Sequence, residues 1–229
     1  SDNEKGLKHG LGNMEMMPDI AICDPEVTVS MPPKITAETG MDALTHALEA
    51  LASNRANYLS DILATQAAID IMKTLPQAYQ NGNDRKAREI MLEASMVAGM
   101  AFTNVSLGIV HSMAHTLGGI FHVSHGLADA VLLPYVIRYN EADPRAKKVY
   151  DDFAQKVGAQ HLYTAVEELN KTLNIPSCLK EIIPEEAQFV ARLDEMAKLA
   201  REDGCTKTNP VIPDEEEFKQ LFMKAYKGE

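Results

Sequence analysis

The sequence contains no tryptophan and only three cysteines, which are scattered and lack the spacing of a zinc site or a disulfide framework. Basic residues are also few, because 22 Lys and Arg face 33 Asp and Glu in 229 residues and leave a net charge of −11. Nucleic-acid binding depends mainly on Lys and Arg, so we expect no nucleic-acid partner. No apolar run approaches the roughly 18 residues of a membrane span, and the first residues do not form a signal peptide. We therefore expect a cytoplasmic protein without a membrane partner.

Glycine is scarce too, with 13 residues, and the sequence has no P-loop and no complete dinucleotide-binding fingerprint. The nearest stretch is Gly10-Leu-Gly12-Asn-Met-Glu15, where Glu15 replaces the third small residue. We interpret this stretch as a turn. The sequence does have enough apolar residues, 45% of the total, for a sizeable core.

The chain divides near residue 35. Residues 19–23 are a short β-like run, and Pro32-Pro33 interrupts any regular element after it. A lone strand is not stable, so its partners must come from elsewhere. Residues 36–229 are helical in pattern, and we predict a mainly α multi-helix bundle of about nine helices behind this β-like leader. The expected helices cover about 36–53, 58–79, 84–104, 107–117, a segment from 126, a segment from 144, 161–174, 185–202 and 214–226.

Three local features sharpen these predictions. Thr36 is a plausible N-cap of the first helix, and Gly118-Gly119 is a plausible stop for the fourth. The stretch 94–102 is apolar nearly all round, so we expect the third helix to be a buried central helix.

Histidines cluster strongly, with four of the seven lying between residues 111 and 125. Asp42 and His46 are four residues apart on a predicted helix and share one face, as do His111 and His115. His125 lies where a loop meets a helix. Each could be a surface pair or a satisfied core histidine, but one metal site explains all five together. Nitrogen and carboxylate donors without thiolate suit Fe(II), Zn(II), Co(II) or Ni(II).

Five candidate groups exceed the four that a four-coordinate site uses. One histidine is therefore expected not to bind the metal, and a free imidazole beside the site is placed for proton transfer. The residues alone do not identify which histidine this is.

Three motifs resemble the iron-containing (group III) alcohol dehydrogenases. They are Thr39-Gly-Met-Asp42-Ala-Leu-Thr-His46-Ala-Leu-Glu, Gly108-Ile-Val-His111-Ser-Met-Ala-His115-Thr-Leu-Gly-Gly and His125-Gly-Leu-Ala-Asp-Ala-Val-Leu-Leu-Pro134. The resemblance extends over nearly the whole chain.

The resemblance implies an N-terminal Rossmann-like domain that binds NAD or NADP, followed by an all-helical domain that binds Fe(II) or alternatively Zn(II). Residues 1–35 would be the end of that cofactor domain, otherwise missing, and its linker, and 36–229 the metal-binding domain. Asp42, His46, His111 and His125 match the family's metal ligands. His115 matches the histidine near the nicotinamide, so the resemblance gives it a cofactor-binding and a catalytic, proton-path role.

The implied function is metal-dependent alcohol dehydrogenation, in which hydride passes between a primary alcohol or aldehyde and NAD(P) while the metal polarises the substrate oxygen. Family members commonly form oligomers, so we expect a homo-oligomer. Two alternatives remain: a glycerol-dehydrogenase-like polyol oxidoreductase, or a metal-binding helical fragment that is inactive without its cofactor domain. Ser124 and Asp129 depart from the frequent Pro and Asn of the family, and we expect neither to contact a ligand. His122, in the same loop, is expected to have a structural or supporting role.

Overall fold

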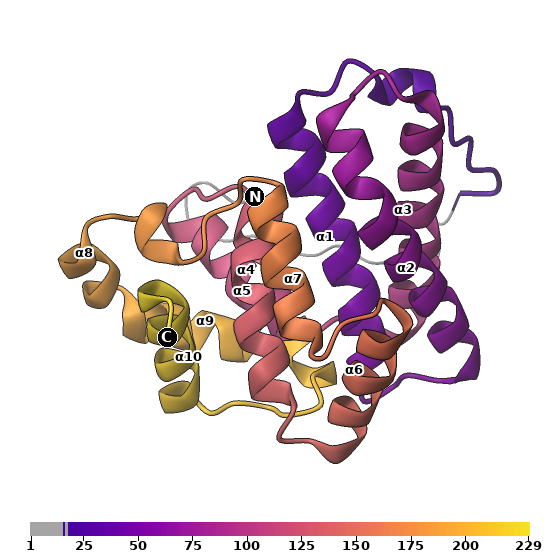
Figure 1. Cartoon of the computed structure of the whole chain (residues 1–229). Helices are drawn as coiled ribbons and strands as arrows, with labels where there is room; N and C mark the ends of the chain where they lie inside the picture. Colours follow the sequence, from indigo (N-terminus) through magenta and orange to yellow (C-terminus); the bar gives the residue numbers. More distant parts are fainter. Residues whose placement is uncertain (1–15, 17) are drawn as a thin grey trace.

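A computed structural model describes residue 16 and residues 18–229, and its regular structure is helical throughout (Figure 1). This part of the chain forms ten α-helices and no β-strand, which confirms the predicted mainly α fold. The predicted turn at Gly10–Glu15 lies outside the described residues. The α-helices are α1 (Pro33–Ala52), α2 (Tyr58–Gln80), α3 (Arg85–Val105), α4 (Ile109–Ile120), α5 (His125–Asn140), α6 (Pro144–Lys156), α7 (Leu162–Thr172), α8 (Glu186–Ala191), α9 (Leu193–Glu202) and α10 (Glu215–Lys227).

The β-like run at residues 19–23 pairs with no strand in the described part of the chain, and residues 18–22 are exposed. It leads into a short 3-10 helix, η2 (Pro25–Thr28), and then into α1. The buried Arg88 of α3 fastens this connection, because its guanidinium donates hydrogen bonds to the carbonyl oxygens of Met31 and Gly82 and to Oγ1 of Thr36.

Two predicted helix ends and one predicted helix were wrong. The first helix begins at Pro33, where proline is favourable, so Thr36 lies inside it and is not its N-cap. The fourth helix continues through Gly118-Gly119 to Ile120. The predicted helix at 185–202 is two helices, α8 and α9, which are separated at Arg192.

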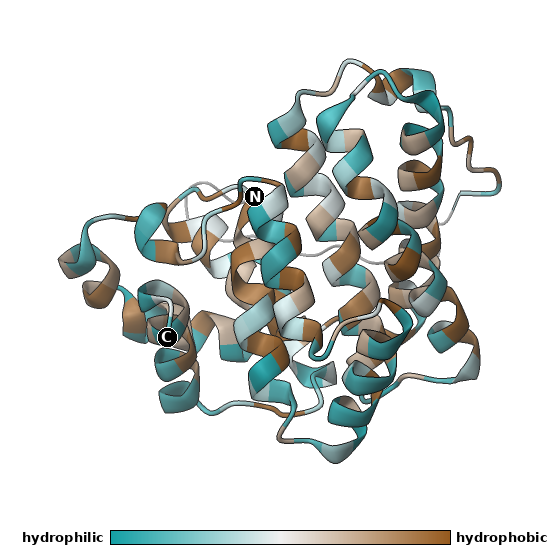
Figure 2. Cartoon of the chain, in the orientation of Figure 1, coloured by the Kyte–Doolittle hydropathy of each residue, from teal (hydrophilic) through white to brown (hydrophobic). Residues whose placement is uncertain are grey.

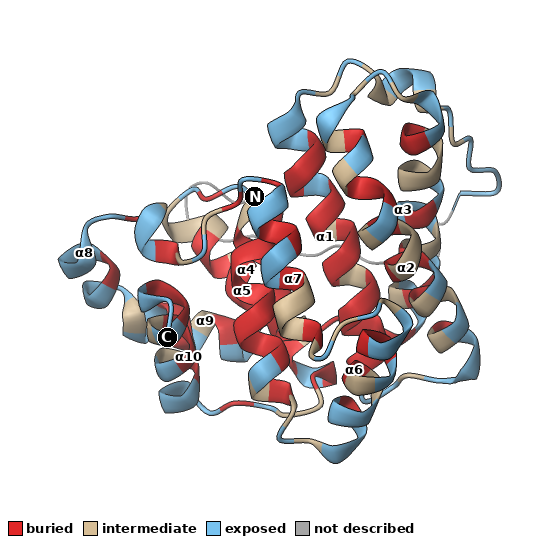
Figure 3. Cartoon of the chain, in the orientation of Figure 1, coloured by how far each residue is buried: buried red, intermediate tan, exposed pale blue. Residues whose placement is uncertain are grey.

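The prediction that the third helix is central was also wrong. Its small residues Ala94, Ala98 and Ala101 are buried, but Met96 and Met100 on another face are 38% and 52% exposed. The helix α3 therefore buries its alanine face and leaves a methionine face exposed in this structure. The most extensively buried helices are α1 and α5, and Figure 3 shows burial concentrated toward the middle of the molecule.

Helices α1, α2 and α3 pack together as one group, and α5 packs against α1, α4 and α7 (Figure 1). Helices α9 and α10 form a further pair that contacts this centre through α4 and α5. The surface helices show the expected alternation of polar and apolar residues (Figure 2). In the described part, no single helix is long and apolar enough to span a membrane, and α3 with α4 meets those criteria only as a pair bent by 104°.

Glycine permits the contact between α1 and α5 that matters most for the site. A Cβ atom at Gly126 would lie 2.1 Å from the carbonyl oxygen of Glu38 in α1. Any larger residue would therefore push the start of α5 away from α1. This close approach places His125 beside Asp42.

Candidate metal centre

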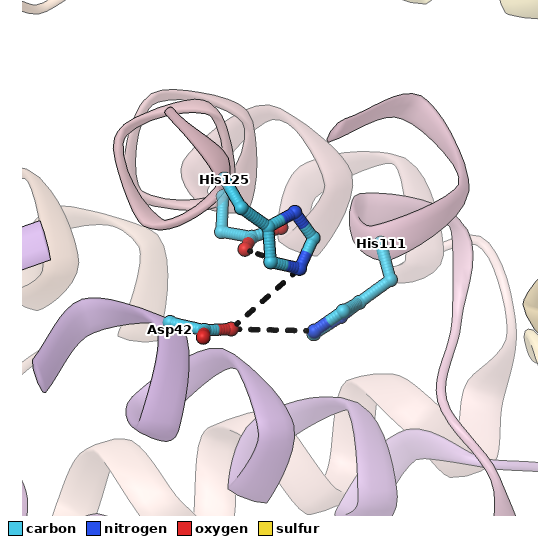
Figure 4. Close-up of side chains that lie close together, drawn as sticks. Asp42, His111 and His125 are labelled. Atoms are coloured by element: carbon cyan, nitrogen blue, oxygen red, sulfur yellow. Dashed lines mark ion pairs between the residues drawn. The ribbon is translucent and has the colours of Figure 1, made fainter. Parts of the chain in front are cut away.

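Three helices bring Asp42, His111 and His125 together (Figure 4). Asp42 and His46 lie one turn apart on α1, His111 lies in α4, and His125 is the first residue of α5. Oδ1 of Asp42 is the common neighbour, with Nε2 of His46, His111 and His125 at 3.4, 3.5 and 3.9 Å respectively. The rings of His46 and His111 stack with their centroids 4.7 Å apart. Asp42 therefore contacts all three histidines. Three of the four predicted ligands, Asp42, His111 and His125, share one cluster of potential donor atoms, whereas His46 contacts Asp42 but lies outside that cluster.

The polar atoms at this point fit a metal ion. The side chain of His111 is 2% exposed, whereas those of Asp42, His46 and His125 are 25%, 21% and 26% exposed, so the centre is reached from one side. Oδ1 of Asp42 and Nε2 of His111 are buried and have no hydrogen-bond partner. Buried polar atoms without partners are costly and need an explanation. A carboxylate oxygen and an imidazole nitrogen are both metal ligands. A cation bound between them would therefore explain why neither atom has a hydrogen-bond partner.

Asp129 is a further member of this cluster, and here the expectation from sequence was wrong. Its Oδ2 atom lies 3.4 Å from Nε2 of His125, so the residue does contact a proposed ligand. One potential donor atom each from Asp42, His111, His125 and Asp129 lies within 4.8 Å of all the others. Ser124, the other departure, lies outside this cluster, and its hydroxyl donates to Oε2 of Glu38 at 2.7 Å.

Glu49 organises the other side of His111. Its Oε2 atom lies 2.6 Å from Nδ1 of His111, and its Oε1 accepts the backbone N–H of Val110 at 2.7 Å. One carboxylate thus caps the start of α4 and fixes the orientation of the imidazole. With Nδ1 facing Glu49, Nε2 faces Asp42, which is the arrangement that carboxylates impose on metal-binding histidines.

Electrostatics at the centre follow from burial and from the crowding of carboxylates. Burial raises the pKa of Asp42, but the close His111 imidazole and the charges of His46 and His125 outweigh it and leave the pKa at about 2. Burial and the adjacent His111 lower the pKa of His46 to about 4. Burial alone would lower the pKa of His111, but the Asp129 and Glu49 carboxylates raise it well above its usual value. Complete burial raises the pKa of Asp129 strongly.

His115 lies next to this cluster and is held by a different carboxylate. Its Nδ1 atom is 2.9 Å from Oδ2 of Asp203, and its ring stacks on that of His125 with centroids 5.2 Å apart. Asp203 is itself fixed by the N–H of Cys205, which donates to Oδ1 at 2.8 Å. The side chain of His115 is 22% exposed, so the imidazole connects the buried centre to the surface.

The remaining site prediction concerned His122. This residue is exposed and has a left-handed backbone with φ of 56°. A structural role in the turn before α5 stays a prediction.

Sequence reasoning missed Glu49 and Asp203. A signal for Glu49 exists, because it follows Asp42 by seven residues and so shares its helix face within an apolar stretch. Asp203 lies 88 residues after His115, and only the packing of α9 on α4 brings them together.

Comparison with known proteins defines the class of this chain. Residues 36–226 match the Fe-containing alcohol dehydrogenase family, C-terminal, and the chain belongs to this family. It is 39% identical to an NADPH-dependent butanol dehydrogenase of Clostridium saccharobutylicum, covering 100% of this chain and 60% of that protein. It is 42% identical to the 1-propanol dehydrogenase PduQ of Salmonella typhimurium, covering 97% and 63%. The chain thus spans about three fifths of these relatives.

Solved structures of similar proteins lead to the same family. An iron-containing alcohol dehydrogenase from Thermococcus thioreducens matches with a TM-score of 0.89 and 38% identity over 95% of this chain and 57% of that one. A sulfoacetaldehyde reductase from Bifidobacterium kashiwanohense in complex with NAD+ matches with a TM-score of 0.83 and 30% identity, covering 93% and 56%.

Proposed function

We propose that this chain is the metal-binding part of an NAD(P)-dependent alcohol dehydrogenase that interconverts primary alcohols and aldehydes. One observation carries the proposal: buried atoms of Asp42 and His111, from different helices, face each other without hydrogen-bond partners. Membership of the family supports the reaction class, and the relatives named above are alcohol dehydrogenases. They lend no support to the glycerol-dehydrogenase-like alternative.

The proposed metal ligands are Asp42, His46, His111 and His125. A divalent ion held by them supplies Lewis acidity toward an alcohol or carbonyl oxygen. Asp42 contributes negative charge, because its low pKa keeps it ionised at neutral pH. Glu49 holds His111 with Nε2 toward the centre. Iron(II) is our proposal for the native metal, although Zn(II) accepts the same ligands.

His115 is proposed to carry the hydroxyl proton. The Asp203 carboxylate accepts a hydrogen bond from Nδ1–H, which leaves Nε2 as the acceptor in the neutral ring. Because the ring lies against His125 and reaches the surface, it can take a proton from an alcohol at the centre and pass it to solvent. We also propose that the nicotinamide of NAD or NADP approaches from the same side, where His115 contacts it, and that the cofactor is held by a separate N-terminal domain. Residues 1–35 would be the end of that domain.

We also propose a cytoplasmic location and a homo-oligomer. The three cysteines are free, which is consistent with a reducing cytoplasm. Family resemblance favours a homo-oligomer.

Metal analysis of the purified chain, reconstituted with Fe(II) or Zn(II), tests the site. We expect about one ion per chain, and its loss in His111→Ala. The matched control is His161→Ala, because His161 precedes α7 and stacks on Tyr163 outside the metal cluster. A wild-type chain that holds no metal would refute the assignment. The reaction itself is tested by oxidation of short primary alcohols with NAD or NADP by the full-length gene product.

A further inference from the structure

We propose that Asp129 binds the metal ion directly, so that the centre of this chain contains two carboxylates in place of one. This inference rests on the metal site of the proposed function and adds a ligand to it.

The position of Asp129 follows the pattern of the site. His125 and Asp129 are four residues apart on α5, just as Asp42 and His46 are on α1, so both members of each pair face the same way. Oδ2 of Asp129 is 3.4 Å from Nε2 of His125, and the carboxylate lies within the cluster that Asp42, His111 and His125 form. The helix therefore directs the carboxylate into the centre.

The surroundings of Asp129 do not satisfy a carboxylate in any other way. The side chain is 0% exposed, and both Oδ1 and Oδ2 are buried without a hydrogen-bond partner. A buried carboxylate normally has several donors or a bound cation. Pairing with His125 alone engages one oxygen and leaves Oδ1 unsatisfied. Burial and the nearby Asp42 both raise the pKa of Asp129, so the two acids need a proton or a metal ion between them.

A divalent cation resolves both problems. Among the ligands of the proposed function only Asp42 is charged, and it neutralises half of the charge of the ion. Asp129 would neutralise the other half at the ion itself. Oxygen ligands suit Mn(II) better than Zn(II), which imidazole suits. A second carboxylate should therefore favour binding of Mn(II) more than that of Zn(II).

The test measures the dissociation constants of Mn(II) and Zn(II) by competition with a chromophoric chelator, for the wild-type chain and Asp129→Asn. Asn keeps the shape and removes the charge. We expect about tenfold or greater weakening for Mn(II) and a smaller loss for Zn(II). Asp61→Asn is the matched control, because Asp61 on α2 also has a buried oxygen without a hydrogen-bond partner but lies outside the cluster. This control should not change either constant.

Two further readouts separate a ligand from a merely structural residue. Without metal, Asp129→Asn should unfold at the same or a higher temperature than wild type, because Asn fills the same space and cannot become a buried charge. Its stabilisation by added metal should be smaller. In the cobalt(II)-substituted chain, the visible absorption bands should shift in Asp129→Asn and not in Asp61→Asn. If the Asn variant does not fold, the same binding, unfolding and cobalt measurements are made on Asp129→Ala.

The outcomes are distinguishable from failure of the proposed function. If wild type binds metal and His111→Ala does not, while Asp129→Asn keeps wild-type constants and cobalt bands, Asp129 is not a ligand and the metal site stands. Equal weakening for Mn(II) and Zn(II) with unchanged cobalt bands also overturns the inference. If wild type binds no metal, the proposed function itself fails.

Discussion

Nδ1 of His111 lies 2.6 Å from Oε2 of Glu49, and the same carboxylate caps α4 through the N–H of Val110. The start of a helix and the orientation of a proposed ligand therefore depend on one buried side chain of another helix. This coupling explains how a 20-residue helix, α1, both carries Asp42 and controls the histidine opposite it.

Glu49→Gln should weaken metal binding. The amide oxygen can still accept the N–H of Val110, so the fold should persist, but the neutral group no longer holds the imidazole by charge. Loss of such a supporting partner typically weakens metal affinity about 10–100-fold. Chelator competition measures this loss. The exposed Glu168→Gln on α7 serves as the control and should bind metal like wild type.

Gly126→Ala should destabilise the fold and the site together. The added Cβ would lie 2.1 Å from the Glu38 carbonyl oxygen, so α5 must move, at a cost of about 1–3 kcal/mol in the free energy of unfolding. His125 would move with it, so metal affinity should fall as well. Urea unfolding and chelator competition measure the two effects.

Gly99→Ala on α3 should have the opposite effect on stability to Gly126→Ala. A Cβ atom at Gly99 would have no neighbouring atom within 4 Å, so the change should raise stability by about 0.5–1 kcal/mol, since alanine favours helix. Equal effects of the two substitutions would contradict the close-packing explanation.

Metal binding should weaken as the pH falls. Carboxylates raise the pKa of His111 well above its usual value, so at neutral pH this imidazole holds a proton that an incoming ion must displace. Each proton released makes the apparent dissociation constant rise about tenfold per unit decrease in pH below that pKa. Proton release on adding Zn(II) to a weakly buffered chain measures this directly. A pH-independent constant between pH 6 and 8 would argue against His111 as a ligand.

Asp203→Asn should reduce stability in a pH-dependent way. Burial raises the pKa of Asp203, but the hydrogen bond with His115 and the N–H of Cys205 outweigh it, so the pKa in the folded chain is lowered. A lowered pKa means that the ionised group stabilises the fold above the unfolded value of about 3.9 and that this contribution disappears as the pH falls through the folded value. We expect a loss of about 1–3 kcal/mol at pH 7.

Urea unfolding of Asp203→Asn and wild type at a series of pH values measures this contribution. The difference between the two proteins should shrink as the pH drops below about 4. A difference that stays constant across that range would show that Asp203 acts through packing and not through its charge.

The sequence by itself determined the family and most of the proposed site. Asp42 and His46, and likewise His111 and His115, are separated by four residues, and helical periodicity alone places each pair on one face. Asp84 and Asp143 cap their predicted helices through local hydrogen bonds, which is why those starts were predicted correctly. Such relationships involve neighbours in the chain, so pattern alone reveals them.

Only the tertiary structure decided which distant groups meet. The clash-free contact of Gly126 with Glu38 brings His125 to Asp42, and the packing of α9 on α4 gives His115 its carboxylate. Likewise, Asp129 was expected not to contact a ligand, but its side chain is completely buried and lies against His125. Burial and long-range contact depend on how helices pack, and a sequence pattern does not record the partner that each face will have.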